Sequence, residues 1–170
     1  NNEIRKKIRK KEKIEDDETL FANIGRFCNQ KNQLFLVEVF NIIHKKNPKT
    51  RLILIGEGEL KEKILRKISL LELNECIIVK NPIDNVNEYL QAIDILVMPS
   101  LYEGLPVIGV EAQAAGVKCF FSNTITKEAK ILPETEYISL KLSPQEWAKV
   151  ILKEIGTLER KDETKILQNN

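Results

Sequence analysis

The stretch RLILIGEGELKEKILRKISLL, residues 51–71, decides the fold class of this 170-residue chain. A short apolar run, 51–55, ends at a glycine turn, 56–58, and apolar residues then recur at helical spacing as far as Leu71. A short continuous apolar run is typical of a strand that is buried on both faces, and the spacing after the turn predicts an amphipathic helix. The stretch therefore predicts a strand–turn–helix unit of an α/β fold.

The same alternation continues on both sides of this stretch. The other strand-like runs are residues 19–24, 76–79, 95–98, 117–121 and 137–140. The other helical patterns are residues 32–46, 86–92, 107–115 and a last helix that begins at Ser143-Pro144. Short apolar strands that alternate with helices are typical of a parallel sheet with helices on both faces and right-handed crossovers. We expect about six strands in one α/β domain.

The domain organisation predicted from composition has three parts. Residues 1–18 are a charged leader or linker, 19–155 form the α/β domain, and 156–170 are a polar C-terminal helix or tail. The leader holds a basic cluster followed by an acidic one, which we interpret as a solvated linker or loose helix; an electrostatic patch for a membrane or nucleic acid is the less favoured alternative. The chain begins with Asn1-Asn2 rather than Met, so we expect a piece of a longer protein.

Composition argues against several function classes. The net charge of +2 is too small to indicate nucleic-acid binding by itself. The three cysteines form no C-x-x-C pair, and two of them lie in apolar runs, which is typical of buried free thiols in a reducing compartment. His44 is the only histidine, so a histidine-based metal site or a Ser-His-Asp triad has little to work with. No apolar run is long enough to span a membrane.

The loops after the strands are where a ligand is expected, because parallel α/β sheets bind ligands at the carboxyl ends of their strands. Gly25, Arg26 and Lys31 follow the first strand, and an arginine and a lysine beside a helix start suit a diphosphate. Gly56 and Gly58 follow the second strand and permit close approach of backbone or ligand. The full G-x-G-x-x-G fingerprint of dinucleotide-binding folds is absent, and so is a P-loop.

The loop after the third strand, Asn81-Pro82-Ile83, is placed to present backbone groups to the edge of a base. The loop after the fourth strand, residues 99–106, reads PSLYEGLP and ends with a proline suited to a helix start. The residues of this loop expected to contact a ligand are Tyr102, Glu103, Gly104, Leu105 and Pro106.

Two carboxylates, Glu103 and Glu111, belong to this region. A carboxylate can accept hydrogen bonds from both hydroxyls of a vicinal diol, so Glu111 suits a ribose and Glu103 suits the hydroxyls of a sugar. Glu111 lies in the apolar stretch 107–115, where an unpartnered carboxylate would be costly to bury, and this favours a functional role.

These motifs together resemble glycosyltransferase family 4 (group 1), whose members have the GT-B architecture of two Rossmann-like domains. Glu103 and Glu111 are separated by seven residues, the E-x7-E pattern of retaining glycosyltransferases of this architecture. Segment 99–106, Gly25-Arg26 with Lys31, the turn 56–58 and residues 122–128 resemble motifs of the family in their usual order. The resemblance covers residues 19–155 and matches the C-terminal, donor-binding half.

The resemblance implies the role of each site residue. Arg26 and Lys31 would neutralise the donor diphosphate and stabilise the leaving nucleoside diphosphate, and Glu103 would contact the donor sugar, so these three are the expected catalytic residues. Glu111 would accept the ribose hydroxyls, and residues 81–83 would face the base. The donor would be a nucleoside-diphosphate sugar, with UDP favoured, and the family requires no metal or other cofactor.

The same resemblance sets the expected partners and location. A missing N-terminal domain would bind a glycan or lipid-linked acceptor, and without it the chain alone would be inactive. The pathway expected is synthesis of a bacterial surface polysaccharide such as a capsule. The sugar transfer would take place in the cytoplasm, at the inner face of the membrane. A peripheral association of the whole protein with the membrane is compatible with that location.

Three residues depart from the family pattern. Asn81 stands where glycine is common, Gln113 replaces a usual methionine, and Gly109 inside a helix costs about 1 kcal/mol relative to alanine. Two other functions stay open on sequence: a non-catalytic or degenerate α/β nucleotide-binding or regulatory module, and half of a GT-B nucleotide-sugar epimerase. An epimerase would require further acid–base residues. A receiver module would require acidic residues at the ends of the first and third strands, where this chain has Gly25-Arg26 and Lys80-Asn81.

Overall fold

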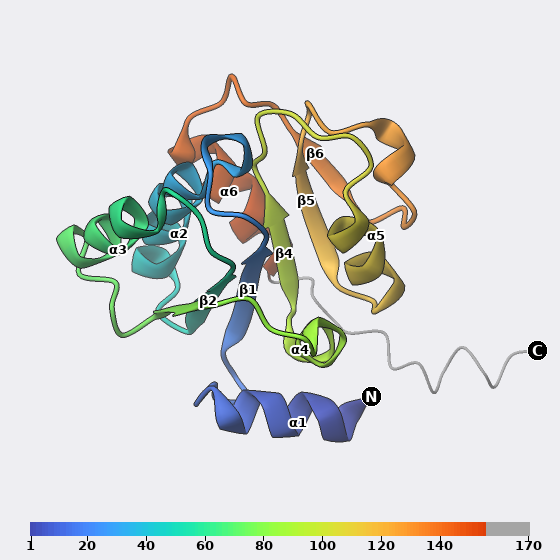
Figure 1. Cartoon of the computed structure of the whole chain (residues 1–170). Coiled ribbons are helices and arrows are strands. Elements are labelled where there is room, and N and C mark those ends of the chain that lie inside the picture. Colours follow the sequence, from blue (N-terminus) through green and yellow to red (C-terminus); the bar gives the residue numbers. More distant parts are fainter. Residues whose placement is uncertain (156–170) are drawn as a thin grey trace, which may run out of the picture.

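A computed structural model of the chain describes residues 1–155 (Figure 1). The strands are β1 (Thr19–Ile24), β2 (Thr50–Ile55), β3 (Ile77–Lys80), β4 (Ile95–Met98), β5 (Lys118–Ser122) and β6 (Glu136–Ile138). The α-helices are α1 (Asn2–Lys11), α2 (Gln33–Lys46), α3 (Lys61–Leu70), α4 (Val86–Ala92), α5 (Val107–Ala114) and α6 (Pro144–Ile155), with short 3-10 helices η1 (Asn29–Lys31) and η2 (Lys127–Ala129). The tail predicted at 156–170 lies outside the described residues.

The strands form one six-stranded sheet in the order β3-β2-β1-β4-β5-β6, and every pairing is parallel. The predicted α/β class and the predicted strand number are confirmed. From β1 the chain builds the sheet outward to β2 and β3, and then returns to add β4 on the other side of β1. The sheet therefore has a topological switch point between β1 and β4, the usual place of a ligand crevice in such folds.

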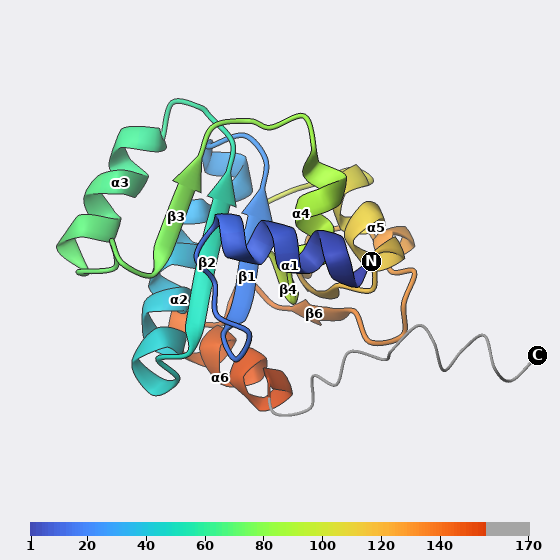
Figure 2. The same ribbon diagram turned by 90° about the horizontal axis from the view of Figure 1, so that it is seen from below.

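Helices cover both faces of the sheet, as expected (Figures 1 and 2). On one face the buried side chains of α2, α3 and α6 pack against alternate strand residues such as Phe21 and Leu52, and Trp147 of α6 is fully buried there. On the other face α1, α4 and α5 pack against the intervening residues, such as Ala22 and Ile53. This alternation follows from the two-residue period of a strand, and it gives the sheet an apolar layer on each side.

The charged leader was predicted to be a solvated linker or a loose helix, and the structure shows a helix that is packed against the domain. Residues 2–11 form α1, which packs against α4, and Ile8 is buried there. Arg9 is also buried: its guanidinium lies 3.2 Å from a carboxylate oxygen of Asp94 and donates to the carbonyl oxygens of Glu15 and Glu18. Asp94 in turn accepts from the backbone N–H of Leu20 at 2.8 Å. One residue of the basic run, Arg9, thus forms a buried ion pair with Asp94 and attaches α1 to the start of β1 and β4. Composition alone does not reveal this long-range pair.

Close packing explains why a glycine stands at position 109 inside a helix. A Cβ built on Gly109 would lie 2.8 Å from Cζ of the buried Phe121 in β5. The glycine therefore allows α5 to approach the sheet closely, and this contact compensates for its low helix propensity.

The cysteines follow the prediction of buried free thiols in part. Cys76 and Cys119 are buried and Cys28 is half-buried, and all three are free. Burial raises the pKa of the Cys119 thiol to about 12, so this side chain stays protonated and serves as a small apolar residue of the core.

Gln113, predicted to be a packing change, is a buried hydrogen-bonding centre between α5 and the segment before β6. Its amide oxygen accepts from the backbone N–H groups of Ile131 and Leu132 and from the hydroxyl of Thr135, at 2.8 to 2.9 Å. Its amide nitrogen donates to the carbonyl oxygens of Gly109 and Ala129. A methionine at this position would supply none of these bonds.

Replacing Gln113 by leucine should lower the free energy of unfolding by about 2–3 kcal/mol, because three donors lose their acceptor in a largely buried place. Urea denaturation monitored by circular dichroism measures this. The matched control is Gln145→Leu on the exposed surface of α6, which should change stability by less than about 0.5 kcal/mol. Equal effects of the two substitutions would contradict the assignment of Gln113 as a hydrogen-bonding centre.

Candidate functional site

The candidate site lies at the carboxyl ends of the strands, where the predicted loops gather; the arrowheads of β1, β2 and β3 point to this edge at the top of Figure 2. The loops after β1 and β4 leave the sheet on the two sides of the switch point. Helix α1 packs on one face of the sheet with α4 and α5, and Glu12, just after α1, pairs with Lys80 at the end of β3 at 3.0 Å (Figure 2).

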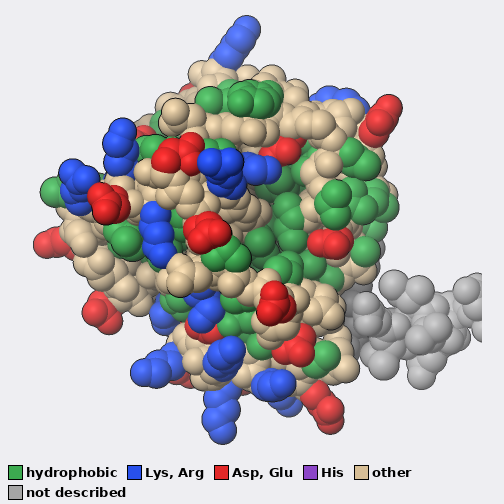
Figure 3. Space-filling model, viewed as in Figure 1, with side chains coloured by type: hydrophobic (Ala, Val, Ile, Leu, Met, Phe, Trp, Pro, Cys, Tyr) green, Lys and Arg blue, Asp and Glu red, His purple; other side chains and the backbone are tan. Residues whose placement is uncertain are grey.

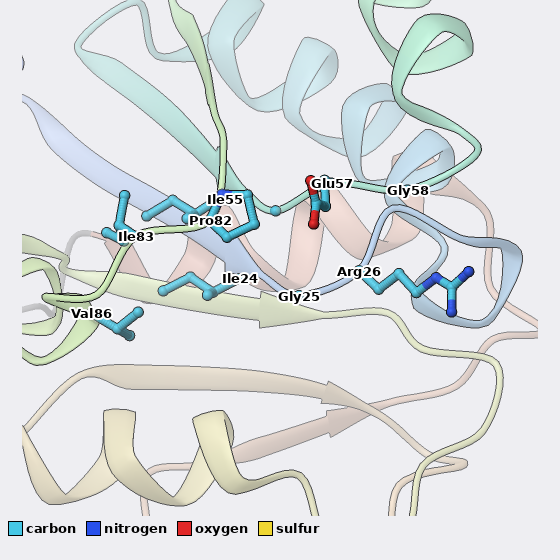
Figure 4. A pocket seen from close by; sticks show the side chains of 10 residues that line it. Ile24, Gly25, Arg26, Ile55, Glu57, Gly58, Pro82, Ile83 and Val86 are labelled. Carbon is cyan, nitrogen blue, oxygen red and sulfur yellow. The ribbon is translucent and has the colours of Figure 1, made fainter.

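A pocket of about 710 Å³ opens beside the ends of β1 and β2 (Figure 4). Its lining is formed by Ile24, Gly25, Arg26, Ile55, Gly56, Glu57, Gly58, Pro82, Ile83 and Val86. The site residues predicted in the loops after the first three strands, apart from Lys31 and Asn81, therefore line the same pocket. Lys31, Asn81 and the residues predicted in 102–111 lie outside this lining.

One end of the pocket is apolar and the other is polar. Ile24, Pro82, Ile83 and Val86 surround the apolar end, and Arg26 extends at the other (Figure 4). Ile24, Ile55, Glu57 and Val86 were not predicted from sequence as site residues. The first three adjoin residues that were predicted, at the ends of β1 and β2, so the strand pattern already contained a signal for them. An apolar slot that ends at a guanidinium suits a planar ring that carries an anionic group.

The glycines of the 56–58 turn allow the loops after β1 and β2 to touch. A Cβ on Gly56 would lie 2.0 Å from the carbonyl oxygen of Gly25, and one on Gly58 would lie 2.3 Å from that of Phe27. Backbone bonds join the same loops, from the N–H of Gly25 to Ile55 at 2.9 Å and from the N–H of Phe27 to Glu57 at 2.8 Å. The predicted close approach at this turn is therefore one of backbone to backbone, and it fixes the wall that carries Arg26.

Arg26 is accessible to a ligand. Its side chain is 73% exposed, and its ion pair with Glu59 is long, at 3.4 Å, and exposed on both sides. Exposed pairs of this kind contribute little free energy, so the guanidinium can turn to another anion at small cost. The backbone beneath it is held by Gln33, whose buried amide donates to the carbonyl oxygen of Arg26 at 2.8 Å.

Lys31 reaches across the switch point and forms an ion pair with Glu103. Its side chain runs past Gly25, with Cε 3.5 Å from the place of a Cβ on that residue. The pair is largely shielded, since the Glu103 side chain is 9% exposed and that of Lys31 is 20% exposed. Glu103 also accepts from the hydroxyl of Ser100 at 3.1 Å. The two residues that sequence placed in separate loops are thus in direct contact.

The loop that carries Glu103 is held from the β1 side by side-chain amides. Asn32 donates to the carbonyl oxygen of Pro99 at 2.9 Å, and Gln30 donates to that of Tyr102 at 3.0 Å. The backbone N–H of Leu101 donates to the carbonyl oxygen of Gln30 at 2.8 Å. These contacts were missed, because ordinary polar residues in a turn give no sequence signal of their long-range partners.

The same loop is held from the β5 side by hydroxyl groups. Ser122 and Thr124 both donate to the carbonyl oxygen of Ser100, at 2.6 and 2.7 Å. Glu103 forms an isolated parallel β-bridge with Ile125. Residues 122–125 belong to the segment after the fifth strand whose sequence resembles a motif of the family. In the structure these residues fix the backbone of the Glu103 loop.

Glu111 is exposed, and no hydrogen bond or ion pair of its side chain is found within residues 1–155. The expectation that burial in an apolar stretch would demand a partner for Glu111 is therefore wrong. Ala112 beside it is buried against the sheet, whereas Glu111 lies on the outer side of α5. Its carboxylate is available to a ligand for a different reason, because solvent reaches it.

The other predicted residues lie at the rim. Tyr102 and Leu105 expose 64% and 58% of their surface, Gly104 has open space around it, and Pro106 is the N-cap residue of α5. Asn81 accepts a hydrogen bond from the ammonium of Lys61 at 2.6 Å, beside the apolar end of the pocket.

Residues 1–155 contain no group of three or more His, Cys, Asp or Glu side chains arranged to hold a metal ion. No helix in that part of the chain has the length and apolar content to cross a membrane.

Comparison with known proteins finds one family along nearly the whole chain. Residues 4–163 match the family model for glycosyl transferases group 1. A putative glycosyltransferase EpsF of Bacillus subtilis is 33% identical over 115 residues, which cover 68% of this chain and 30% of the relative. The Escherichia coli UDP-Gal:alpha-D-GlcNAc-diphosphoundecaprenol alpha-1,3-galactosyltransferase is 31% identical over 107 residues, which cover 61% of this chain and 28% of the relative. The chain thus spans less than a third of the length of these two curated relatives.

Among solved structures, the fold is similar to the C-terminal domain of a group 1 glycosyl transferase, LpcC, from Francisella tularensis. The TM-score is 0.76 at 22% identity, and the match covers 89% of this chain and 82% of that domain. At this identity the likeness concerns the fold alone, and it agrees with half of a GT-B glycosyltransferase.

Gly56→Ala should lower the free energy of unfolding by about 3 kcal/mol, because its Cβ would overlap the backbone of the loop after β1. Chemical denaturation measures the loss. Gly104→Ala is the matched control, since nothing lies within 4 Å of its Cβ position, and it should stay within about 0.5 kcal/mol of the unmodified chain. A Gly56→Ala variant as stable as the control would contradict the backbone contact between the two loops.

Proposed function

The chain belongs to the glycosyl transferases group 1 family, and we propose that it is the donor-binding half of a retaining glycosyltransferase. In this proposal it holds a nucleoside-diphosphate sugar, with UDP as the nucleotide, at the carboxyl ends of β1, β2 and β4. The observation that carries the proposal is the meeting of a cation-edged apolar pocket with the Lys31–Glu103 pair at the switch point of the sheet. The apolar end of the pocket suits the base of the nucleoside, the cations suit the diphosphate, and the carboxylate suits the sugar, in the order in which these groups follow one another in the donor.

The base is assigned to the pocket, and the ribose is assigned to Glu111 on α5, outside the pocket lining. The apolar end formed by Ile24, Pro82, Ile83 and Val86 suits the faces of a base, with the rim at Asn81 near its edge. Glu111, exposed and unpartnered within residues 1–155, is assigned to the ribose hydroxyls.

The diphosphate is assigned to Arg26 and Lys31. The guanidinium of Arg26 can grip a phosphate with two parallel hydrogen bonds, and its exposed pair with Glu59 offers little competition. Charge that develops on the leaving nucleoside diphosphate would be stabilised by these two cations, without a metal.

The sugar is assigned to Glu103 and the backbone of 104–106. The carboxylate of Glu103 is held by Ser100 and by the bonds that fix its loop, so it is positioned before the donor arrives. Preorganised hydrogen-bonding groups of this kind are the main source of transition-state stabilisation in enzymes. The spacing of Glu103 and Glu111 supports the retaining assignment, and the similarity to the Escherichia coli galactosyltransferase, which uses UDP-Gal, supports UDP.

The acceptor is assigned to a second domain outside this chain. Four large apolar residues beside the site, Leu101, Tyr102, Leu105 and Val107, are 44–65% exposed. Figure 3 shows hydrophobic side chains gathered on this face over and around α5. An exposed apolar surface next to a binding site is typical of an interface with another domain. A glycan or lipid-linked acceptor of bacterial surface polysaccharide synthesis, used at the cytoplasmic face of the membrane, fits this arrangement, and the name of the Escherichia coli relative again supports it.

Titration calorimetry with UDP, GDP, ADP and their common sugar conjugates tests donor binding. Binding that prefers one base is expected, and Arg26→Ala and Glu111→Ala should each weaken it about tenfold or more, because each removes a charged partner of the ligand. Arg66→Ala and Glu128→Ala are matched controls at exposed positions away from the pocket, and they should leave the Kd unchanged. A folded chain that binds none of these nucleotides at millimolar concentration would contradict the proposed function.

We further expect that the isolated chain transfers no sugar to any acceptor, because the acceptor side of the active site is assigned to the second domain. A radiolabelled-sugar assay with lipid-linked and soluble glycan acceptors measures this. Sugar transfer by this chain alone would overturn the division of the active site between two domains.

A further inference from the structure

We infer that the carboxylate of Glu103 competes with the donor diphosphate for the ammonium of Lys31, and that the hydroxyls of the donor sugar compensate the carboxylate when Lys31 turns to phosphate. The pair would thereby make the site favour a nucleoside diphosphate that carries a sugar over a free nucleoside diphosphate. The inference rests on the proposed function, since it needs a diphosphate and a sugar in this site.

The first step is the position of Lys31 between the two halves of the site. Its stem passes the backbone of Gly25, which lines the pocket, and its ammonium reaches Glu103 on the other side of the switch point. A diphosphate that extends from the pocket past Arg26 toward the β4 loop must come near this ammonium. Lysine suits an exchange of partners, because its charge is compact and its three donors rotate freely on a flexible stem.

The second step is the difference between the two ion pairs of the site. The Arg26–Glu59 pair is exposed on both sides, at 73% and 57%, whereas the Lys31 and Glu103 side chains are only 20% and 9% exposed. Solvent screens the exposed pair and removes most of its free energy, whereas a shielded pair keeps more. Glu103 is therefore a strong competitor for its lysine, and Glu59 is a weak competitor for its arginine.

The third step is what remains for Glu103 when Lys31 moves away. Its one other hydrogen bond found within residues 1–155 comes from the hydroxyl of Ser100. The backbone of its loop is held on both sides, and the side chain is 9% exposed, so the carboxylate is left in a shielded place with one neutral donor. A shielded carboxylate that loses its cation is costly. Sugar hydroxyls can donate to it and lower this cost, whereas a free nucleoside diphosphate brings no such donors.

The test compares Glu103→Gln with the unmodified chain for UDP and UDP-glucose, or for the GDP or ADP pair if the nucleotide panel selects it. Glutamine keeps the shape but removes the charge that holds Lys31. We expect the Kd for UDP to fall about fivefold, the size of one typical net hydrogen bond. The Kd for UDP-glucose should rise instead, because the sugar loses its charged acceptor. Opposite signs for the two ligands are not expected from a purely structural role.

Two further variants separate the explanations. Glu59→Gln removes the same charge beside the exposed cation and should leave the affinity for UDP within about twofold of the original value. In a double-mutant cycle, Glu103→Gln should no longer improve UDP binding once Lys31→Met is present, because nothing remains to compete for. Circular dichroism and unfolding curves confirm that each variant is folded.

Unchanged or weaker UDP binding by a folded Glu103→Gln variant, with Arg26→Ala still defective, would overturn the competition and leave the proposed function intact. An improvement that persists in the Lys31→Met background would also overturn it, since it would then reflect a general charge effect. Failure of the unmodified chain to bind any of the nucleotides would contradict the proposed function itself, and the inference with it.

Discussion

Every feature of the candidate site depends on the position of β1 in the middle of a parallel sheet, hydrogen-bonded to β2 on one side and β4 on the other. Parallel strands present their carboxyl ends at one edge, so the loops after β1, β2 and β4 become neighbours although they are far apart in sequence. The reversal of strand order at β1 separates the loops after β1 and β4 at their base. Lys31 closes this gap by reaching to Glu103.

The two walls of the site are held by different kinds of interaction. On the β2 side, the glycines let backbone contact backbone, and the carbonyl and amide groups of the two turns bond directly. On the β4 side, the loop is held by side chains: the amides of Gln30 and Asn32 from one direction and the hydroxyls of Ser122 and Thr124 from the other. Both arrangements fix the backbone and leave Arg26 and Glu111 free to meet a ligand, which is the combination that a preorganised binding site requires.

Helix α5 connects this site to the body of the domain. Its first residue, Val107, belongs to the exposed apolar surface, and its outer side carries Glu111. On its inner side Gly109 lies close to Phe121, and Gln113 binds the segment before β6. A shift of α5 would therefore disturb both the sheet and that segment. The helix has only eight residues, and these tertiary contacts, more than its own propensity, must keep it in place.

The sequence by itself determined the fold class, the succession of strands and helices along the chain, and the loops in which a ligand must be sought. It could do so because hydrophobic periodicity and glycine turns are local properties. It also named Arg26, Lys31, Glu103 and Glu111, since charges at strand ends stand out from apolar surroundings. Only the tertiary structure decided that Lys31 pairs with Glu103, that Glu111 is exposed, that Arg9 and Asp94 anchor a helical leader, and that Gln113 replaces packing by five hydrogen bonds. Each of these joins residues separated along the chain or depends on which side of a helix faces the sheet, and periodicity within a short window carries no information about such contacts.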